Sequence, residues 1–109
     1  MEISQRHAEL CGALADKHRL LLLYALADNP KSVTELVQRI GLSPPAVSRH
    51  LRIMRQSGIV SAERRGKSIY YFVTDQRIVR AMDMLRTILT EQMQEQGDAA
   101  HQAALRPVI

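Results

Sequence analysis

Six basic side chains gather in one short stretch of this 109-residue sequence. Between Ser43 and Lys67 the only acid is Glu63, so the stretch carries a net charge of +5, whereas the whole chain carries +4. Arginine can pair with guanine edges, serine can bond several base edges, and both can bind phosphates. The basic residues are Arg49, Arg52, Arg55, Arg64, Arg65 and Lys67. A basic segment on a near-neutral body is typical of a protein that binds a polyanion.

A second pair of reactive side chains lies near the amino terminus. His7 and Cys11 are four residues apart, which puts an imidazole and a thiol on one face of a helix. Two ligands are too few for a tetrahedral zinc site, but two adjacent copies could supply four. Cys11 could also form a disulfide between subunits. The simpler interpretation, which we favour, is that both side chains lie on the apolar stripe of Ile3, Leu10 and Leu14 and pack at the interface between two subunits.

Other kinds of chemistry have no signature here. The sequence has no glycine-rich phosphate loop, no paired carboxylates on one helix face and no cysteine–histidine–Asx set, so we expect neither an enzyme nor a cofactor. Cys11 is the only cysteine, which excludes a disulfide scaffold within the chain and fits a reducing compartment. The longest apolar run, Leu20 to Ala27, is far shorter than the roughly 20 residues of a membrane span. We expect a cytoplasmic protein without a signal peptide or membrane contact.

Residues that typically begin and end helices indicate which elements position the basic residues. A helix is predicted from Glu2 to Ala15, and a second, almost wholly apolar helix from Lys17 to Asp28 after the N-cap Asp16. Two further helices are predicted, one opened by the capping box Ser32-Val33-Thr34-Glu35 and ended by Gly41, the other running from Ser43 to Ser57 before Gly58. Two short helices joined by so tight a turn form a helix-turn-helix.

The second helix of that pair has two unlike faces. Val47, Leu51 and Met54 form an apolar stripe, and the opposite face carries Ser48, Arg49, Arg52 and Gln56, with His50 and Arg55 on the flanks. In a helix-turn-helix this second helix enters the major groove of DNA. The sequence therefore predicts a basic recognition helix.

A basic hairpin and a long helix complete the predicted domain. Two strands, Ile59–Arg65 and Ser68–Val73, flank Gly66-Lys67, which suits a two-residue turn and puts Arg64, Arg65 and Lys67 at the tip of a wing. A last helix follows Asp75 and should end at Gly97. We predict a mainly α winged helix-turn-helix domain over residues 1–97 and an Ala/Gln-rich, partly disordered tail over residues 98–109.

These motifs resemble the ArsR/SmtB family of bacterial repressors over about residues 8 to 90. The Val47-Ser48-Arg49-His50-Leu51 stretch is the most specific part of the resemblance. The other matching runs are Ala13-Leu14-Ala15-Asp16 with Arg19-Leu20, Ser32-Val33-Thr34-Glu35-Leu36, Gly41-Leu42-Ser43, Gly58-Ile59-Val60, Arg64-Arg65-Gly66-Lys67 and Tyr70-Tyr71. The resemblance implies a winged-helix homodimer, joined through its first and last helices, that represses by binding an inverted repeat of double-stranded DNA in its own promoter.

The resemblance also assigns roles to individual residues. The readers of DNA bases would be Ser43, Ala46, Ser48, Arg49 and His50. Arg52 and Arg55 would contact the DNA backbone, and Arg64, Arg65 and Lys67 would be the contacts of the wing. Many members have glutamine where this chain has Pro44, which cannot donate a hydrogen bond to a base.

Two metal sites common in the family are absent from this sequence. Ser32 and Thr34 stand where one site has cysteines, and Arg77 and Ile88 stand where a second site, whose ends Asp75 and Glu91 could match, has histidines. The effector is therefore unknown, and we expect no bound metal. Three alternatives stay open: a regulator without a small-molecule signal, a metal or redox sensor built on Cys11 with His7, and a winged helix that binds another protein.

Overall fold

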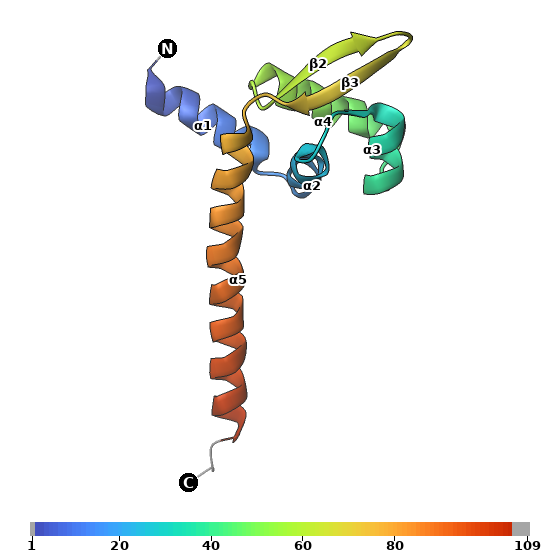
Figure 1. Cartoon of the computed structure of the whole chain (residues 1–109). Helices are drawn as coiled ribbons and strands as arrows, with labels where there is room; N and C mark the ends of the chain where they lie inside the picture. Colours follow the sequence, from blue (N-terminus) through green and yellow to red (C-terminus); the bar gives the residue numbers. More distant parts are fainter. Residues whose placement is uncertain (1, 106–109) are drawn as a thin grey trace. The chain divides into compact units, whose positions relative to one another are not determined.

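The computed structural model describes the backbone of residues 2–105 and the side chains of residues 2–97. Its elements follow one another along the chain as Figure 1 shows. They are α1 (Ile3–Leu14), α2 (Lys17–Leu26), β1 (Lys31–Ser32), α3 (Val33–Ile40), α4 (Pro44–Gln56), β2 (Val60–Arg65), β3 (Ser68–Val73) and α5 (Gln76–Leu105). The chain divides into two units, residues 1–79 with the winged helix-turn-helix and residues 80–109 with most of α5.

The predicted caps start and stop the helices of the first unit. The Asp16 carboxylate accepts hydrogen bonds from the backbone N–H groups of His18 (2.8 Å) and Arg19 (3.2 Å) at the start of α2. Ser32 and Glu35 form the predicted capping box of α3. Gly41 then ends α3 with a φ of 80°, a left-handed conformation that glycine adopts without steric cost.

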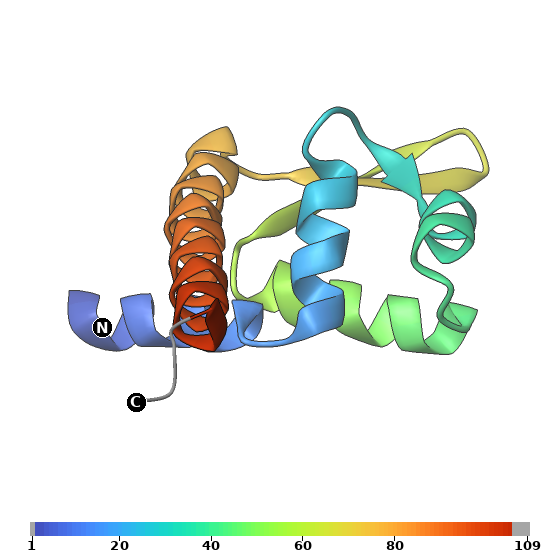
Figure 2. The same ribbon diagram turned by 90° about the horizontal axis from the view of Figure 1, so that it is seen from below.

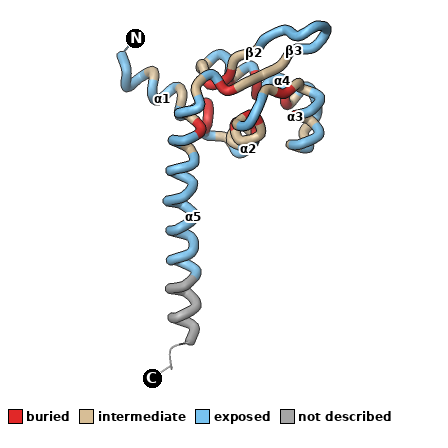
Figure 3. The backbone as a smooth tube through the Cα atoms, in the orientation of Figure 1, coloured by how far each residue is buried: buried red, intermediate tan, exposed pale blue. Residues whose placement is uncertain are grey.

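A small apolar core holds α2, α3 and α4 together. Helix α2 contacts both α3 and α4, and Figure 2 shows these three helices from below. The buried segments appear red in Figure 3, and buried residues occur in all three helices. The largest fully buried side chains are Leu22, Leu23, Leu26, Leu36, Val47, Leu51, Met54, Ile59 and Val60. The recognition helix is thus fixed by the apolar stripe that the sequence predicted, together with the neighbours of that stripe.

The wing is the predicted antiparallel hairpin with one strand added. Strands β2 and β3 pair up to Arg65 and Ser68, and Gly66 at the turn has a φ of 62°. The two-residue strand β1 pairs with β3 on its other edge, so the sheet has the order β1-β3-β2 rather than two strands. The ammonium group of Lys31 is buried beside β1, where it donates to the Ala25 carbonyl (2.6 Å) and to Asp28 (2.6 Å).

The last helix differs from the prediction at its carboxyl end. Our predicted break at Gly97 is wrong, because α5 is a 30-residue helix that continues through Gly97 to Leu105. A glycine inside a helix costs only about 0.5–1 kcal/mol relative to alanine, and the glutamine, glutamate and alanine residues around it favour the helix. The predicted tail is therefore helical to Leu105, and residues 106–109 lie outside the described residues.

The first helix has the predicted bounds to within a residue but buries little of its stripe within this chain. Leu14 is buried, whereas Ile3, His7 and Cys11 are exposed. Within residues 2–105 no helix is both long and apolar enough to cross a membrane.

Candidate nucleic-acid interface

The recognition helix α4 presents a polar face to solvent and an apolar face to the core. It begins at the N-cap Ser43, whose hydroxyl accepts a hydrogen bond from the Ala46 N–H (3.3 Å), and Pro44 and Pro45 fill its first turn. A proline costs nothing there, because the first N–H groups of a helix have no partner inside it. Gly58 follows the helix with a φ of 80°, which turns the chain into the wing.

The exposed face of α4 carries most of the residues expected to contact DNA. Ser43, Ser48 and Arg49 are exposed, as are Arg52 and Arg55, while Ala46 is half-buried. Positions 48, 49, 52 and 55 recur at helical spacing, so these side chains share one side of the helix. Within the described part of the chain, the guanidinium groups of these three arginines make no hydrogen bond or ion pair. Three guanidinium groups are thus available to an anionic partner.

The tip of the wing holds the second basic group. Arg64, Arg65 and Lys67 are all exposed. The Arg64 Nε donates to the Gly66 carbonyl (3.2 Å), while Arg65 forms an ion pair with Glu63 and lies over the Tyr70 ring, 5.1 Å from its centroid. Arg65 is therefore already partnered, and an approaching phosphate would compete with Glu63 for it.

His50 does not lie where a base reader must lie. Its side chain is only 5% exposed, and its Nδ1 is 3.2 Å from the Nη1 of Arg19, whose Nε donates to the Ala13 carbonyl (2.6 Å). Burial lowers the pKa of His50, and the charges of Arg19 and Arg49 lower it further, against the opposing effect of Asp16. His50 was expected to read DNA bases, but it is buried and therefore cannot contact a base in this structure. The signal was in the sequence, because position 50 shares the 3.6-residue period of Val47, Leu51 and Met54.

Two arginines outside the expected set of DNA contacts, Arg6 and Arg19, hold α4 in place. Arg19 of α2 contacts the middle of the helix through His50, as described above. Arg6 of α1 donates from Nη2 to the carbonyl of Ser57 (2.7 Å), which is the C-cap of α4. Cations at a helix carboxyl terminus satisfy its unpaired carbonyls and complement the helix dipole. No local pattern reveals such contacts, since their partners are 31 and 51 residues away.

The side chains at the positions of the common family metal sites do not fit a metal. Ser32 is used as a helix cap, and Arg77 forms an ion pair with Asp75 (2.7 Å) that raises the pKa of the guanidinium. Among the described residues, one group of three or more metal-ligating side chains lies close together, and it consists of Asp16, His18 and His50. His7 and Cys11 are not part of it.

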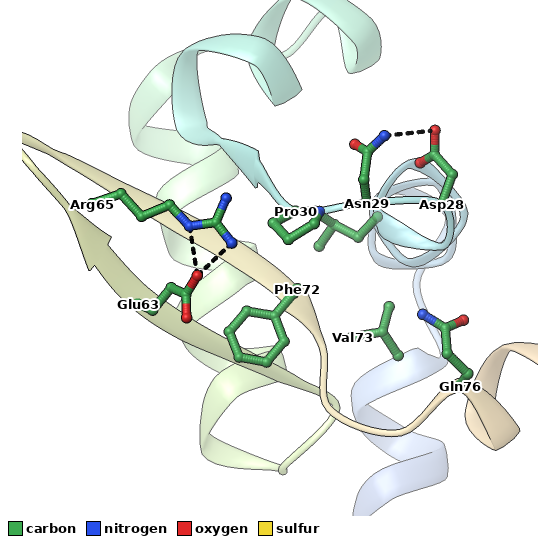
Figure 4. A pocket seen from close by; sticks show the side chains of 9 residues that line it. Asp28, Asn29, Pro30, Glu63, Arg65, Phe72, Val73 and Gln76 are labelled. Atoms are coloured by element: carbon green, nitrogen blue, oxygen red, sulfur yellow. Dashed lines mark hydrogen bonds and ion pairs between the residues drawn. The ribbon is translucent and has the colours of Figure 1, made fainter.

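A shallow, open pocket lies between the turn after α2 and the sheet (Figure 4). It has a volume of about 370 Å³, and its apolar lining residues are Leu26, Pro30, Phe72 and Val73. Its acidic residues are already paired, Asp28 with Lys31 and Glu63 with Arg65. Paired charges leave little to select a ligand, so this pocket is a weaker candidate site than the surface of α4.

Known proteins share this arrangement. The chain matches the family described as "Bacterial regulatory protein, arsR family" over residues 16–62, from the cap of α2 into β2. It is 39% identical over 71 residues to the HTH-type transcriptional regulator NmtR of Mycobacterium tuberculosis, a match that covers 65% of this chain and 59% of that protein. It is 36% identical over 85 residues to the biofilm growth-associated repressor of Xylella fastidiosa, covering 78% of this chain and 75% of the relative.

Solved structures agree with the sequence matches. The crystal structure of the transcriptional repressor BigR from Xylella fastidiosa matches with a TM-score of 0.71 and 35% identity, over 78% of this chain and 87% of that chain. The chain therefore belongs to the ArsR family of bacterial transcriptional regulators, whose members bind DNA through a winged helix-turn-helix.

Proposed function

We propose that this protein is a homodimeric repressor that binds an inverted repeat of double-stranded DNA near its own promoter, in the cytoplasm. The observation that carries the proposal is the exposed face of α4, with Ser48, Arg49 and Arg52 facing solvent and the arginines unpaired within the described chain. In this proposal α4 enters the major groove, where arginine pairs with guanine and serine with several base edges.

The other expected contacts take supporting roles in the proposal. Arg55 binds the DNA backbone beside α4, and Arg64 and Lys67 reach the phosphates or the adjacent minor groove from the wing. Arg65 joins them once its ion pair with Glu63 opens. Ser43 and Ala46 sit in the first turn, where the amino end of the helix also attracts phosphate. Pro44 contributes only apolar contact there, for instance to a thymine methyl group.

The dimer is supported by apolar side chains that the chain leaves uncovered. On α5, Leu85, Ile88 and Leu89 recur at helical spacing and are exposed, as are Met84 and Met93 beside them. On α1, Ile3 is exposed as well. Contiguous exposed apolar residues on a small protein mark an interaction surface, and a second copy of the chain would cover them. Two copies would present two recognition helices to half-sites about 34 Å apart on one face of the DNA.

Fluorescence anisotropy with a labelled duplex of the upstream DNA tests the proposal. Wild-type protein should bind this duplex far more tightly than a scrambled one, and the affinity should fall steeply with salt because several phosphates are contacted. Arg49→Ala should weaken specific binding by about 5- to 150-fold, which corresponds to about 1–3 kcal/mol for one bidentate contact to a base.

The matched control is Arg80→Ala, which removes the same charge from α5. It should reduce affinity only to the small extent that net charge alone dictates. Equal losses in Arg49→Ala and Arg80→Ala would contradict a specific role for α4. A footprint over one unpaired half-site would contradict the dimer.

A further inference from the structure

A cluster of metal-ligating side chains lies behind the recognition helix, on the side away from its exposed arginines. Asp16 and His18 come from the start of α2, and His50 comes from the middle of α4. One ligand atom from each of the three side chains lies within 4.8 Å of the others. The two imidazole rings are 5.9 Å apart between centroids and tilted by 35°. The fold thus joins three ligands from two helices that a metal ion could link.

The ligand types suit a first-row divalent cation. Two imidazoles and a carboxylate are accepted by Zn²⁺, Co²⁺ and Ni²⁺, and three protein ligands leave a position for water. Zinc–nitrogen bonds of about 2.0–2.1 Å would bring the ligand atoms to about 3.3 Å from one another, so closure needs movements on the order of 1 Å. His18 and Asp16 can supply them, because their side chains are 40% and 33% exposed.

Arg19 occupies the lone pair that a metal would use. A guanidinium can only donate, so the contact between Arg19 Nη1 and His50 Nδ1 (3.2 Å) makes Nδ1 the acceptor. A neutral imidazole has one such acceptor nitrogen. An ion can therefore bind His50 only by displacing Arg19. This would remove the contact between Arg19 of α2 and His50 of α4.

We propose that Asp16, His18 and His50 form a site for a divalent cation of the Zn²⁺ class, and that the ion replaces the contact of Arg19 with His50. This proposal does not depend on the proposed function, because it concerns the ion and the three ligands alone.

Titration of the full-length, reduced protein with Co²⁺, followed by visible absorption, tests the proposal. One ion should bind per chain, Zn²⁺ should displace it, and the spectrum should lack the charge-transfer band of a thiolate ligand. His18→Ala should weaken binding by about tenfold or more, as expected for loss of a ligand or its close support. Asp16→Asn should also weaken binding while it keeps the cap of α2, because asparagine caps helices as well as aspartate does.

The matched control is His7→Ala, which removes an exposed histidine from α1. It should leave Co²⁺ affinity unchanged. Absence of Co²⁺ absorption at excess metal would overturn the site. Loss of binding in His7→Ala but not in His18→Ala, or a thiolate band, would overturn it too and move the ion to Cys11.

Discussion

Helices α4 and α5 carry similar apolar stripes, but the stripe of α4 is buried within the chain and that of α5 is exposed. In α4, Val47, Leu51 and Met54 are completely buried against α2, α3 and the start of the wing. In α5, Leu85 and Leu89 are 48% and 50% exposed in the second unit of the chain. An apolar helical stripe therefore says that a helix will be covered, but it does not say whether its own chain will cover it.

The difference separates folding from assembly. The first unit buries the apolar stripe of α4 without a second chain, so its stability depends on its own packing. The exposed apolar side chains of α5 contribute little hydrophobic stabilisation to the single chain. In our proposal they become buried when a second copy binds. Mutations in the two helices should accordingly change different measured quantities.

The largest effect is expected in the core of the first unit. Leu51→Ala should lower the free energy of unfolding by about 2–5 kcal/mol, because it removes buried methyl groups and leaves a cavity. Urea denaturation followed by circular dichroism, at one fixed protein concentration, measures the change. A loss below 1 kcal/mol, within the range of ordinary surface substitutions, would mean that Leu51 is not packed as described.

The next effect should appear in assembly rather than in folding. Leu89→Ala should weaken dimerisation by about 2 kcal/mol, or roughly 30-fold, because each copy loses about half of the 1.5–3 kcal/mol of a fully buried leucine. Sedimentation equilibrium measures the dissociation constant. Leu21→Ala is the matched control, since Leu21 is exposed to a similar extent on α2. A similar shift in both variants would contradict an interface on α5.

A smaller loss of stability is expected at the capping box of α3. Ser32→Ala should destabilise the first unit by about 1 kcal/mol, because the N–H of Glu35 loses its side-chain acceptor. Thermal unfolding should show a lower midpoint, and the dimer dissociation constant should not change. A changed dissociation constant would show that the stability of the first unit and dimerisation through α5 are coupled.

The smallest expected effect is a stabilisation of helix α5. Gly97→Ala should favour helical α5 by about 0.5–1 kcal/mol, since an added Cβ would meet nothing within 4 Å. Helical content by circular dichroism should rise or stay constant. A fall in helical content would indicate that Gly97 ends the helix in solution, as the sequence alone predicted.

Local signals in the sequence were sufficient for most of the first unit. Asp16, Ser32, Gly41 and Gly66 each act through contacts or backbone angles within a few residues, so caps and turns could be predicted where they occur. The added strand β1 could not, because two residues carry no alternating pattern and pair with β3 through a contact that spans forty residues. The prediction of a helix end at Gly97 failed because the low helix propensity of a single glycine is too weak to end a helix.

The candidate interface shows the same division. That a basic, hydroxyl-bearing helix is followed by a basic hairpin could be predicted from the residues alone, because charge and helical period are properties of neighbouring residues. Which of these side chains face outward depends on how the helices pack, and this packing turns His50 inward to Arg19. Only the fold, likewise, brought Asp16 and His18 to His50 and Arg6 to the end of α4. Contacts between residues far apart in the chain depend on how the helices pack, and packing is a property of the whole core rather than of any local pattern.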